Sequence, residues 1–115
     1  MVALNRTNRA RLAEEVEVAS RFWQRLRGLL GRGGLPGGGA LWIVPCRSIH
    51  TWFMRFPIDV AFLDEGLRVR RTAARVPPFR VVRTPGARSV LELPAGRLEA
   101  TGTREGHLLA FVPPA

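Results

Sequence analysis

Apolar and polar residues alternate along this chain over short stretches that are typical of β-strands. In Glu15-Val16-Glu17-Val18, charged and apolar side chains alternate as in a strand with one face in the core. The run from 58 to 63 is apolar except for Asp59, which is typical of a strand buried on both faces. Turn residues separate the runs at Asp64-Glu65-Gly66, Pro77-Pro78 and Pro85-Gly86. We expect strands at 2–5, 11–18, 40–44, 51–54, 58–63, 67–72, 79–83, 89–93, 97–101 and 108–112.

One segment has helical rather than strand periodicity. Ser20 is a suitable N-cap for a helix over 21–30, and Gly31 is a suitable residue to end it. A glycine-rich stretch, 31–39, follows this helix. Such a loop can hold phosphate on its backbone amides, but it lacks the Gly-Lys-Ser/Thr ending of a P-loop and follows a helix instead of preceding one. We therefore expect a connector there.

These elements predict a β-rich α+β fold. Many short strands at regular spacing with a single helix are typical of a small barrel-like or sandwich-like antiparallel sheet. With 115 residues, the chain has the length of one compact domain, residues 1–115. The one short helix is expected near residues 21–30.

The charge of the chain is strongly positive, at +9, and every basic residue other than histidine is an arginine. Arginine suits phosphate contacts, because its planar fork binds bidentately. The arginines are spread from Arg6 to Arg104 instead of forming a block, so nucleic acid is a less favoured partner than a small molecule or a protein. The single cysteine cannot form an internal disulfide, and no run has the length of a signal peptide or membrane span. We expect a cytoplasmic protein with no membrane partner.

The richest chemistry lies in the segment from Cys46 to Asp64. Cys46, His50 and Met54 follow one another at intervals of four, and a thiolate, an imidazole and a thioether are the ligands that Cu(I) prefers. Core packing explains buried Cys and Met equally well and is favoured. A second alternative pairs the Cys46 thiol with His50 as nucleophile and base, oriented by Asp59. No metal site is assigned, and no cofactor is identified.

Asp59 and the aromatic residues of the same segment allow further interpretations. A carboxylate within an apolar strand must find hydrogen-bond donors or shift its pKa. The favoured role for Asp59 is structural, as an acceptor for backbone amides or as the partner of an arginine such as Arg55. Trp52, beside Arg47 and Arg55, would be able to stack on a base of single-stranded nucleic acid, although Trp52 and Phe53 must point to opposite faces of a strand.

Three motifs give the chain a resemblance to a known family. They occur in order as Arg25-Leu26-Arg27-Gly28-Leu29-Leu30-Gly31-Arg32, then the run from His50 to Gly66 that includes His50-Thr51-Trp52-Phe53-Met54-Arg55-Phe56-Pro57-Ile58-Asp59, then Val90-Leu91-Glu92-Leu93-Pro94-Ala95-Gly96. The chain resembles the domain of unknown function 192 family over about residues 16–112. The resemblance implies a compact β-rich domain with one short helix and gives no catalytic residue, because the family has no established activity.

The positions that recur in that family, as matched here, are Arg25, Gly28, Met54, Pro57, Asp59, Glu92 and Gly96. Two departures concern polar features. Arg55-Phe56 stands where many members have Lys-Asn-Thr, and Gly106-His107 where many have Gly-Asp. Arg25, Asp59 and Glu92 would be able to form one buried or cleft-lining ion network, in which removal of any partner is costly.

The sequence therefore favours a non-enzymatic module that binds a small ligand or a partner in a cleft near residues 46–59. Two alternatives remain open, a thiol- or soft-metal-dependent protein that uses Cys46, His50 and Met54, and an arginine-rich nucleic-acid-binding domain. The candidate binding residues are Cys46, His50, Trp52, Met54, Asp59, Arg25 and Glu92.

Overall fold

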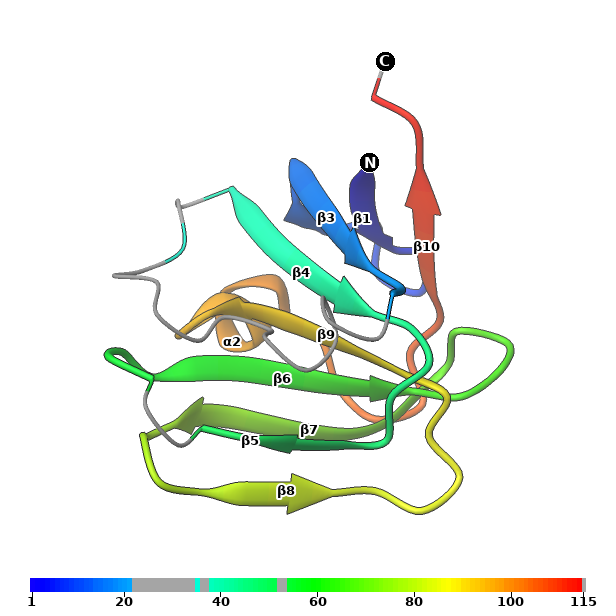
Figure 1. The fold of residues 1–115 in the computed structure, drawn as a ribbon. Helices are drawn as coiled ribbons and strands as arrows, with labels where there is room; N and C mark the ends of the chain where they lie inside the picture. The colour runs from blue at the N-terminus through cyan, green and yellow to red at the C-terminus, as the bar shows by residue number, and fades with distance from the viewer. Residues whose placement is uncertain (22–34, 36–37, 52–53, 115) are drawn as a thin grey trace.

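The structure, a computed structural model, describes residues 1–21, 35, 38–51 and 54–114. Ten strands and one helix, α2, are found there (Figure 1). In chain order they are β1 (Val2–Asn5), β2 (Arg11–Ala13), β3 (Glu15–Ala19), β4 (Gly39–Ile43), β5 (Ser48–His50), β6 (Ile58–Leu63), β7 (Val69–Val76), β8 (Val81–Arg83), β9 (Ser89–Pro94), α2 (Arg97–Thr101) and β10 (Leu109–Val112).

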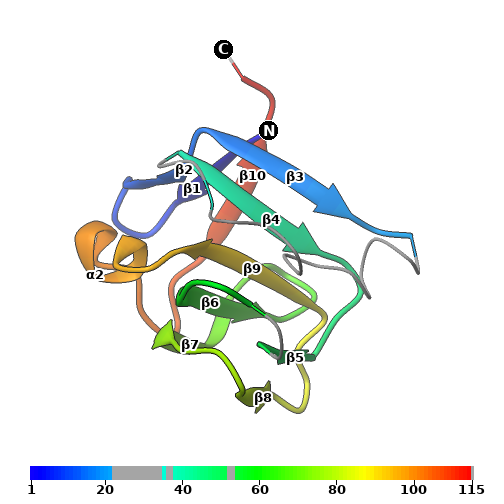
Figure 2. The same ribbon diagram turned by 60° about the vertical axis from the view of Figure 1, so that its left-hand side comes forward.

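A five-stranded sheet with the order β3-β4-β9-β6-β7 forms the centre of the fold. Its strands pair antiparallel except for β3 and β4, which run parallel, so the sheet is mixed rather than purely antiparallel. A three-stranded sheet, β10-β1-β2, and a two-stranded ribbon, β5-β8, complete the fold. Figures 1 and 2 show the three-stranded sheet and the ribbon at opposite sides of the central sheet.

The core lies on both faces of the central sheet, which explains why all six residues of β6 are buried. On one face, Ala61, Leu63, Leu91 and Leu93 pack with residues of β1, β2, β10 and α2. On the other face, residues of the central sheet pack with Ile49 of β5, Met54 and Ala87; the sheet members include Leu41, Ile43, Val60, Phe62 and Val90. Because both faces of β6 are buried, its sequence is a nearly continuous apolar run and does not alternate between apolar and polar residues.

The prediction of a β-rich α+β fold is confirmed, with several differences in its elements. The expected strand at 97–101 is wrong, because these residues form α2. The expected strand at 51–54 is also wrong: the strand here is β5, at 48–50, while Thr51 and Met54 lie outside any strand and residues 52–53 lie outside the described part. The predicted helix at 21–30 lies almost wholly outside the described residues.

The single strand expected at 11–18 is in fact two strands that belong to different sheets. The chain leaves β2 at Ala13 and enters β3 at Glu15, with Glu14 between them. The amides of Glu14 and Glu15 both donate to the carbonyl oxygen of Gly38, at 2.9 and 3.0 Å, which fixes this crossing point. In the part of the chain that the structure describes, no helix is long and apolar enough to cross a membrane.

Candidate functional site

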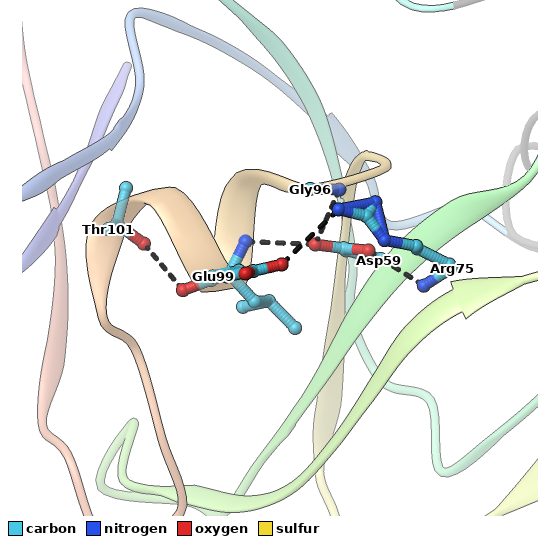
Figure 3. A network of polar contacts seen from close by, with 6 residues as sticks. Asp59, Arg75, Gly96, Glu99 and Thr101 are labelled. Atoms are coloured by element: carbon cyan, nitrogen blue, oxygen red, sulfur yellow. Dashed lines mark hydrogen bonds and ion pairs between the residues drawn. The ribbon is translucent and has the colours of Figure 1, made fainter.

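Asp59 lies in the middle of the fold and is fully buried on β6. Its Oδ1 accepts a hydrogen bond from the backbone amide of Arg75 (2.8 Å), and its Oδ2 accepts from the amides of Gly96 (3.1 Å) and Leu98 (2.9 Å) (Figure 3). Gly96 and Leu98 belong to the start of α2, so the carboxylate supplies the acceptor that unpaired helix N-terminal amides require. Asp59 thus has the structural role of an acceptor for backbone amides, and exposed Arg55 is not its partner.

Glu92 is also buried, with 3% of its surface exposed, but it lies on the other face of the central sheet from Asp59. Glu92 is paired with Val60 in the β6–β9 register, whereas Asp59 is paired with Leu93. Because adjacent residues of a strand point to opposite faces, the two carboxylates are separated by the sheet. The expected single network of Arg25, Asp59 and Glu92 is therefore wrong, and Arg25 itself lies outside the described residues.

Cys46, His50 and Met54 do not share one environment. Met54 is buried with Ile49 in the core, whereas His50 follows Ile49 on β5 and is exposed. Cys46 is half-buried, and its thiol donates to the carbonyl oxygen of Ser48 at 3.2 Å. Among the residues that the structure describes, no group of three His, Cys, Asp or Glu side chains is placed to hold a metal ion. Trp52 lies outside them.

Cys46 does line an open depression of about 390 Å³, which we call the arginine depression. Two segments form it, the β4–β5 connection and the β8–β9 connection, which run side by side at one end of the molecule in Figure 1. Among the described residues, its lining contains two arginines and no carboxylate; the residues are Pro45, Cys46, Arg47, Gly86, Ala87 and Arg88. Neither guanidinium forms an ion pair with any residue in the described ranges.

Backbone hydrogen bonds hold the two segments of the arginine depression together. The amide of Cys46 donates to the carbonyl oxygen of Arg88, and the amide of Thr84 donates to that of Arg47, both at 2.9 Å. The amide of Arg88 in turn donates to the carbonyl oxygen of Leu63, at the end of β6, at 2.7 Å. The backbone of Arg88 is thus fixed directly to the central sheet, and that of Arg47 is fixed to the β8–β9 connection.

A third arginine, Arg70 of β7, lies against the same depression. The guanidinium of Arg70 packs on Gly86, so closely that a Cβ on Gly86 would be 3.0 Å from its Cζ and 3.1 Å from its Nη2. Gly86 has φ of +84°, a conformation that suits glycine. Three arginines distant in sequence therefore meet around one turn.

A second open depression, of about 450 Å³, adjoins the first, and we call it the tryptophan depression. The two share Pro45 and Arg88. The remaining residues of the tryptophan depression come from β4, the position just after it, the β6–β7 turn and the start of β9; they are Trp42, Val44, Asp64, Glu65, Leu67 and Ser89. The Trp42 ring stacks on Phe111 of β10, with 3.9 Å between ring centroids and 14° between planes.

Sequence reasoning missed most residues of these two depressions. Cys46 was a candidate, but Arg88, Gly86, Trp42 and Ser89 were not. The dipeptide Pro85-Gly86 was the sequence feature that indicated this site, since a glycine in a turn allows nearby arginine side chains to approach the backbone closely.

Comparisons with known proteins agree with the fold. The family model DUF192, described as an uncharacterized ACR, matches residues 3–111. A UPF0127 protein from Thermococcus gammatolerans is 34% identical over an alignment 105 residues long that covers 84% of this chain and 65% of that protein, so the chain spans just under two thirds of its relative.

Two solved structures share the fold at 20% sequence identity. A protein of unknown function from Novosphingobium aromaticivorans superposes with a TM-score of 0.82, over 96% of this chain and 82% of its own. A proposed transcription regulator from Sinorhizobium meliloti gives 0.77, over 95% and 89%. With the family model matching nearly its whole length, the chain belongs to the DUF192 family of uncharacterised proteins.

Proposed function

We propose that this protein is a binding module for a small anionic ligand and that the ligand binds in the arginine depression. The observation that supports this proposal is the lining itself: among the described residues, Arg47 and Arg88 line one open space of about 390 Å³ that no carboxylate lines, whereas Asp64 and Glu65 line the adjoining tryptophan depression. Arginine binds carboxylates and phosphates through two parallel N–H···O bonds. The volume lies in the range of small-molecule sites.

The electrostatics of the surrounding turn favour an anion further. Arg70 adds a third guanidinium at Gly86, and all three arginines are exposed, so they are open to a ligand from solvent. Exposed like charges that are close together repel one another, and an anion between them relieves this repulsion. The binding of small anions is accordingly expected to weaken as ionic strength rises.

Removing one guanidinium tests the proposal. We expect Arg47→Gln and Arg88→Gln each to weaken the binding of inorganic phosphate about tenfold, which corresponds to about 1.4 kcal/mol. Titration calorimetry at low salt measures the affinity. The matched control is Arg55→Gln, which removes the same charge from another exposed arginine. Arg55 lies near Ile58, the first residue of β6, whereas the Arg88 amide is hydrogen-bonded to Leu63, the last residue of that strand. A six-residue strand separates the two by about 17 Å.

Equal weakening by Arg55→Gln would show that only net charge matters, and the proposed site would be wrong. An absence of binding by phosphate, sulfate and acetate to the unaltered protein would contradict the proposed function as a whole. A single-stranded oligonucleotide that binds far more tightly than these ions, with a steep loss of affinity in salt, would favour nucleic acid as the ligand instead.

The contact between Arg70 and Gly86 gives a second test. In Gly86→Ala, the new Cβ would lie 3.0–3.2 Å from the atoms of the Arg70 guanidinium, which must therefore shift away from the turn, and the left-handed backbone adds about 1–2 kcal/mol of strain. The control is Gly106→Ala, because Gly106 has a similar φ of +88° but no atom within 4 Å of the position that a Cβ would take. We expect both variants to lose similar stability in urea denaturation, and only Gly86→Ala to bind phosphate more weakly. Equal phosphate affinity in the two variants would remove Arg70 from the site.

A further inference from the structure

Two hydrogen-bond donors in the tryptophan depression have no acceptor within the described part of the chain. Ser89 is only 2% exposed, and its Oγ has no hydrogen-bond partner among the described residues; the same is true of the buried Nε1 of Trp42. A buried polar group that lacks a partner costs about 1–3 kcal/mol, and native proteins contain few such groups. Two of them in the lining of one depression indicate that an occupant supplies the missing acceptor.

The strand register places both donors on the same face of the central sheet. Trp42 of β4 is paired with Leu91 of β9, and Ser89 lies two residues before Leu91 on β9. Residues separated by two along a strand point to one face, and directly paired residues do so as well. One occupant can therefore meet both donors.

The remaining walls of the tryptophan depression combine apolar side chains with two carboxylates, Asp64 and Glu65, both from the β6–β7 turn. The Trp42 ring is held by its stack on Phe111, and half-buried Leu67 comes from the β6–β7 turn. The Asp64 Oδ1 already accepts hydrogen bonds from the amides of Gly66 and Arg68, both at 2.9 Å. Apolar walls with a few placed polar groups are the usual construction of a small-molecule site.

Arg88, which lies between the two depressions, determines which kind of molecule fits. Arg88 and Pro45 line both, so a ligand whose anionic group lies in the arginine depression has room for its remainder in the tryptophan depression. We propose that the ligand is an amphipathic organic anion, whose ring-sized apolar body carries an acceptor for Ser89 Oγ–H and Trp42 Nε1–H. This inference rests on the proposed function, since Arg47 and Arg88 bind the anionic end.

A series of three phosphates tests the inference: inorganic phosphate, phenyl phosphate and 4-nitrophenyl phosphate. Phenyl phosphate adds the apolar ring, and the nitro group adds an acceptor at its far end. We expect 4-nitrophenyl phosphate to bind at least tenfold more tightly than inorganic phosphate, with phenyl phosphate between them. In a ¹H–¹⁵N spectrum, the indole N–H resonance that is lost in Trp42→Phe should shift when 4-nitrophenyl phosphate is added.

Ser89→Ala is the informative variant. Because the Ser89 hydroxyl has no hydrogen-bond partner in the described ranges, its removal should leave the folding stability unchanged or raise it, and the variant is expected to fold. We expect Ser89→Ala to lose most of the preference for 4-nitrophenyl phosphate over phenyl phosphate while it binds inorganic phosphate as before. A retained preference would contradict the role of Ser89.

The outcomes separate this inference from the proposed function. If inorganic phosphate binds and depends on Arg47 and Arg88, but the two aryl phosphates bind no more tightly, the arginine site stands and the amphipathic ligand is wrong. If aryl phosphates bind equally well to Arg88→Gln, the two depressions do not act as one site, which also overturns the inference. If none of the three binds, the proposed function fails first.

Discussion

Replacing Asp59 with alanine is expected to lower the free energy of unfolding by about 3–5 kcal/mol. The carboxylate is fully buried and accepts three backbone hydrogen bonds, two of them from the first residues of α2 and one from Arg75 of β7. Hydrogen bonds to a charged group contribute more than neutral ones, and the amides would lose their acceptor. Urea denaturation followed by circular dichroism measures the change.

Two further variants determine whether the three hydrogen bonds cause this loss. Asp59→Asn keeps the volume but has only one oxygen, so an amide NH₂ must face at least one N–H; we expect a loss of about 1–3 kcal/mol. Glu99→Gln, in α2, removes the exposed ion pair between Glu99 and Arg75 of β7 (3.2 Å) (Figure 3). We expect this variant to change the free energy of unfolding little. A loss in Asp59→Ala no larger than that in Glu99→Gln would show that Asp59 does not hold α2.

The hydrogen bonds between Asp59 and the start of α2 also explain why the sequence did not predict this helix. The sequence Arg97-Leu98-Glu99-Ala100-Thr101 is short and lies among strands, so local pattern does not distinguish a helical turn from a strand. What favours the helix is the acceptor from Asp59, 39 residues before Leu98, together with the left-handed backbone of Gly96 at φ 94°. Neither is visible in the pattern of five residues. By contrast, the apolar run of β6 was predicted correctly, because burial on both faces leaves a local signature.

The candidate site was predicted only in part, for a similar reason. Of the predicted binding residues, Cys46 lines the arginine depression, but Arg88, 42 positions later in the chain, lines it as well because hydrogen bonds join the β4–β5 and β8–β9 connections. The pairing register of the strands was equally important for the prediction of the site. Asp59 and Glu92 were expected in one network, but Glu92 is paired with Val60, so the two carboxylates lie on opposite faces of the sheet. A shift of one residue in register would have reversed this result, and sequence alone does not determine it.

A second large effect is expected at Asn5, at the end of β1. This side chain is fully buried and has all its hydrogen-bonding capacity in use. Its Nδ2 donates to Thr103 Oγ1 (3.1 Å) and to His107 Nδ1 (3.0 Å), and its Oδ1 accepts from the amides of Thr7 (3.0 Å) and Asn8 (3.3 Å). Because the Asn5 amide nitrogen can only donate, the neutral His107 ring carries its proton on Nε2.

Asn5→Ala is expected to lower the free energy of unfolding by about 3–4 kcal/mol, because it leaves buried Thr103 and two turn amides without this partner and opens a cavity. The matched control is Asn8→Ala in the same turn. Asn8 is exposed and donates to the carbonyl oxygen of Thr101 at 2.7 Å, so its loss should cost about 1 kcal/mol.

Amide hydrogen exchange distinguishes a local effect of Asn5→Ala from a general one. Asn5 connects the β1–β2 turn to the loop between α2 and β10, and β1 is paired with β10 from Val2 to Asn5. We therefore expect the amides of Thr7, Asn8 and the β1–β10 ladder to lose protection first, before those of β6 and β9. Uniform loss of protection would mean that the turn and the central sheet unfold as one unit, and equal stability of Asn5→Ala and Asn8→Ala would contradict the connecting role of Asn5.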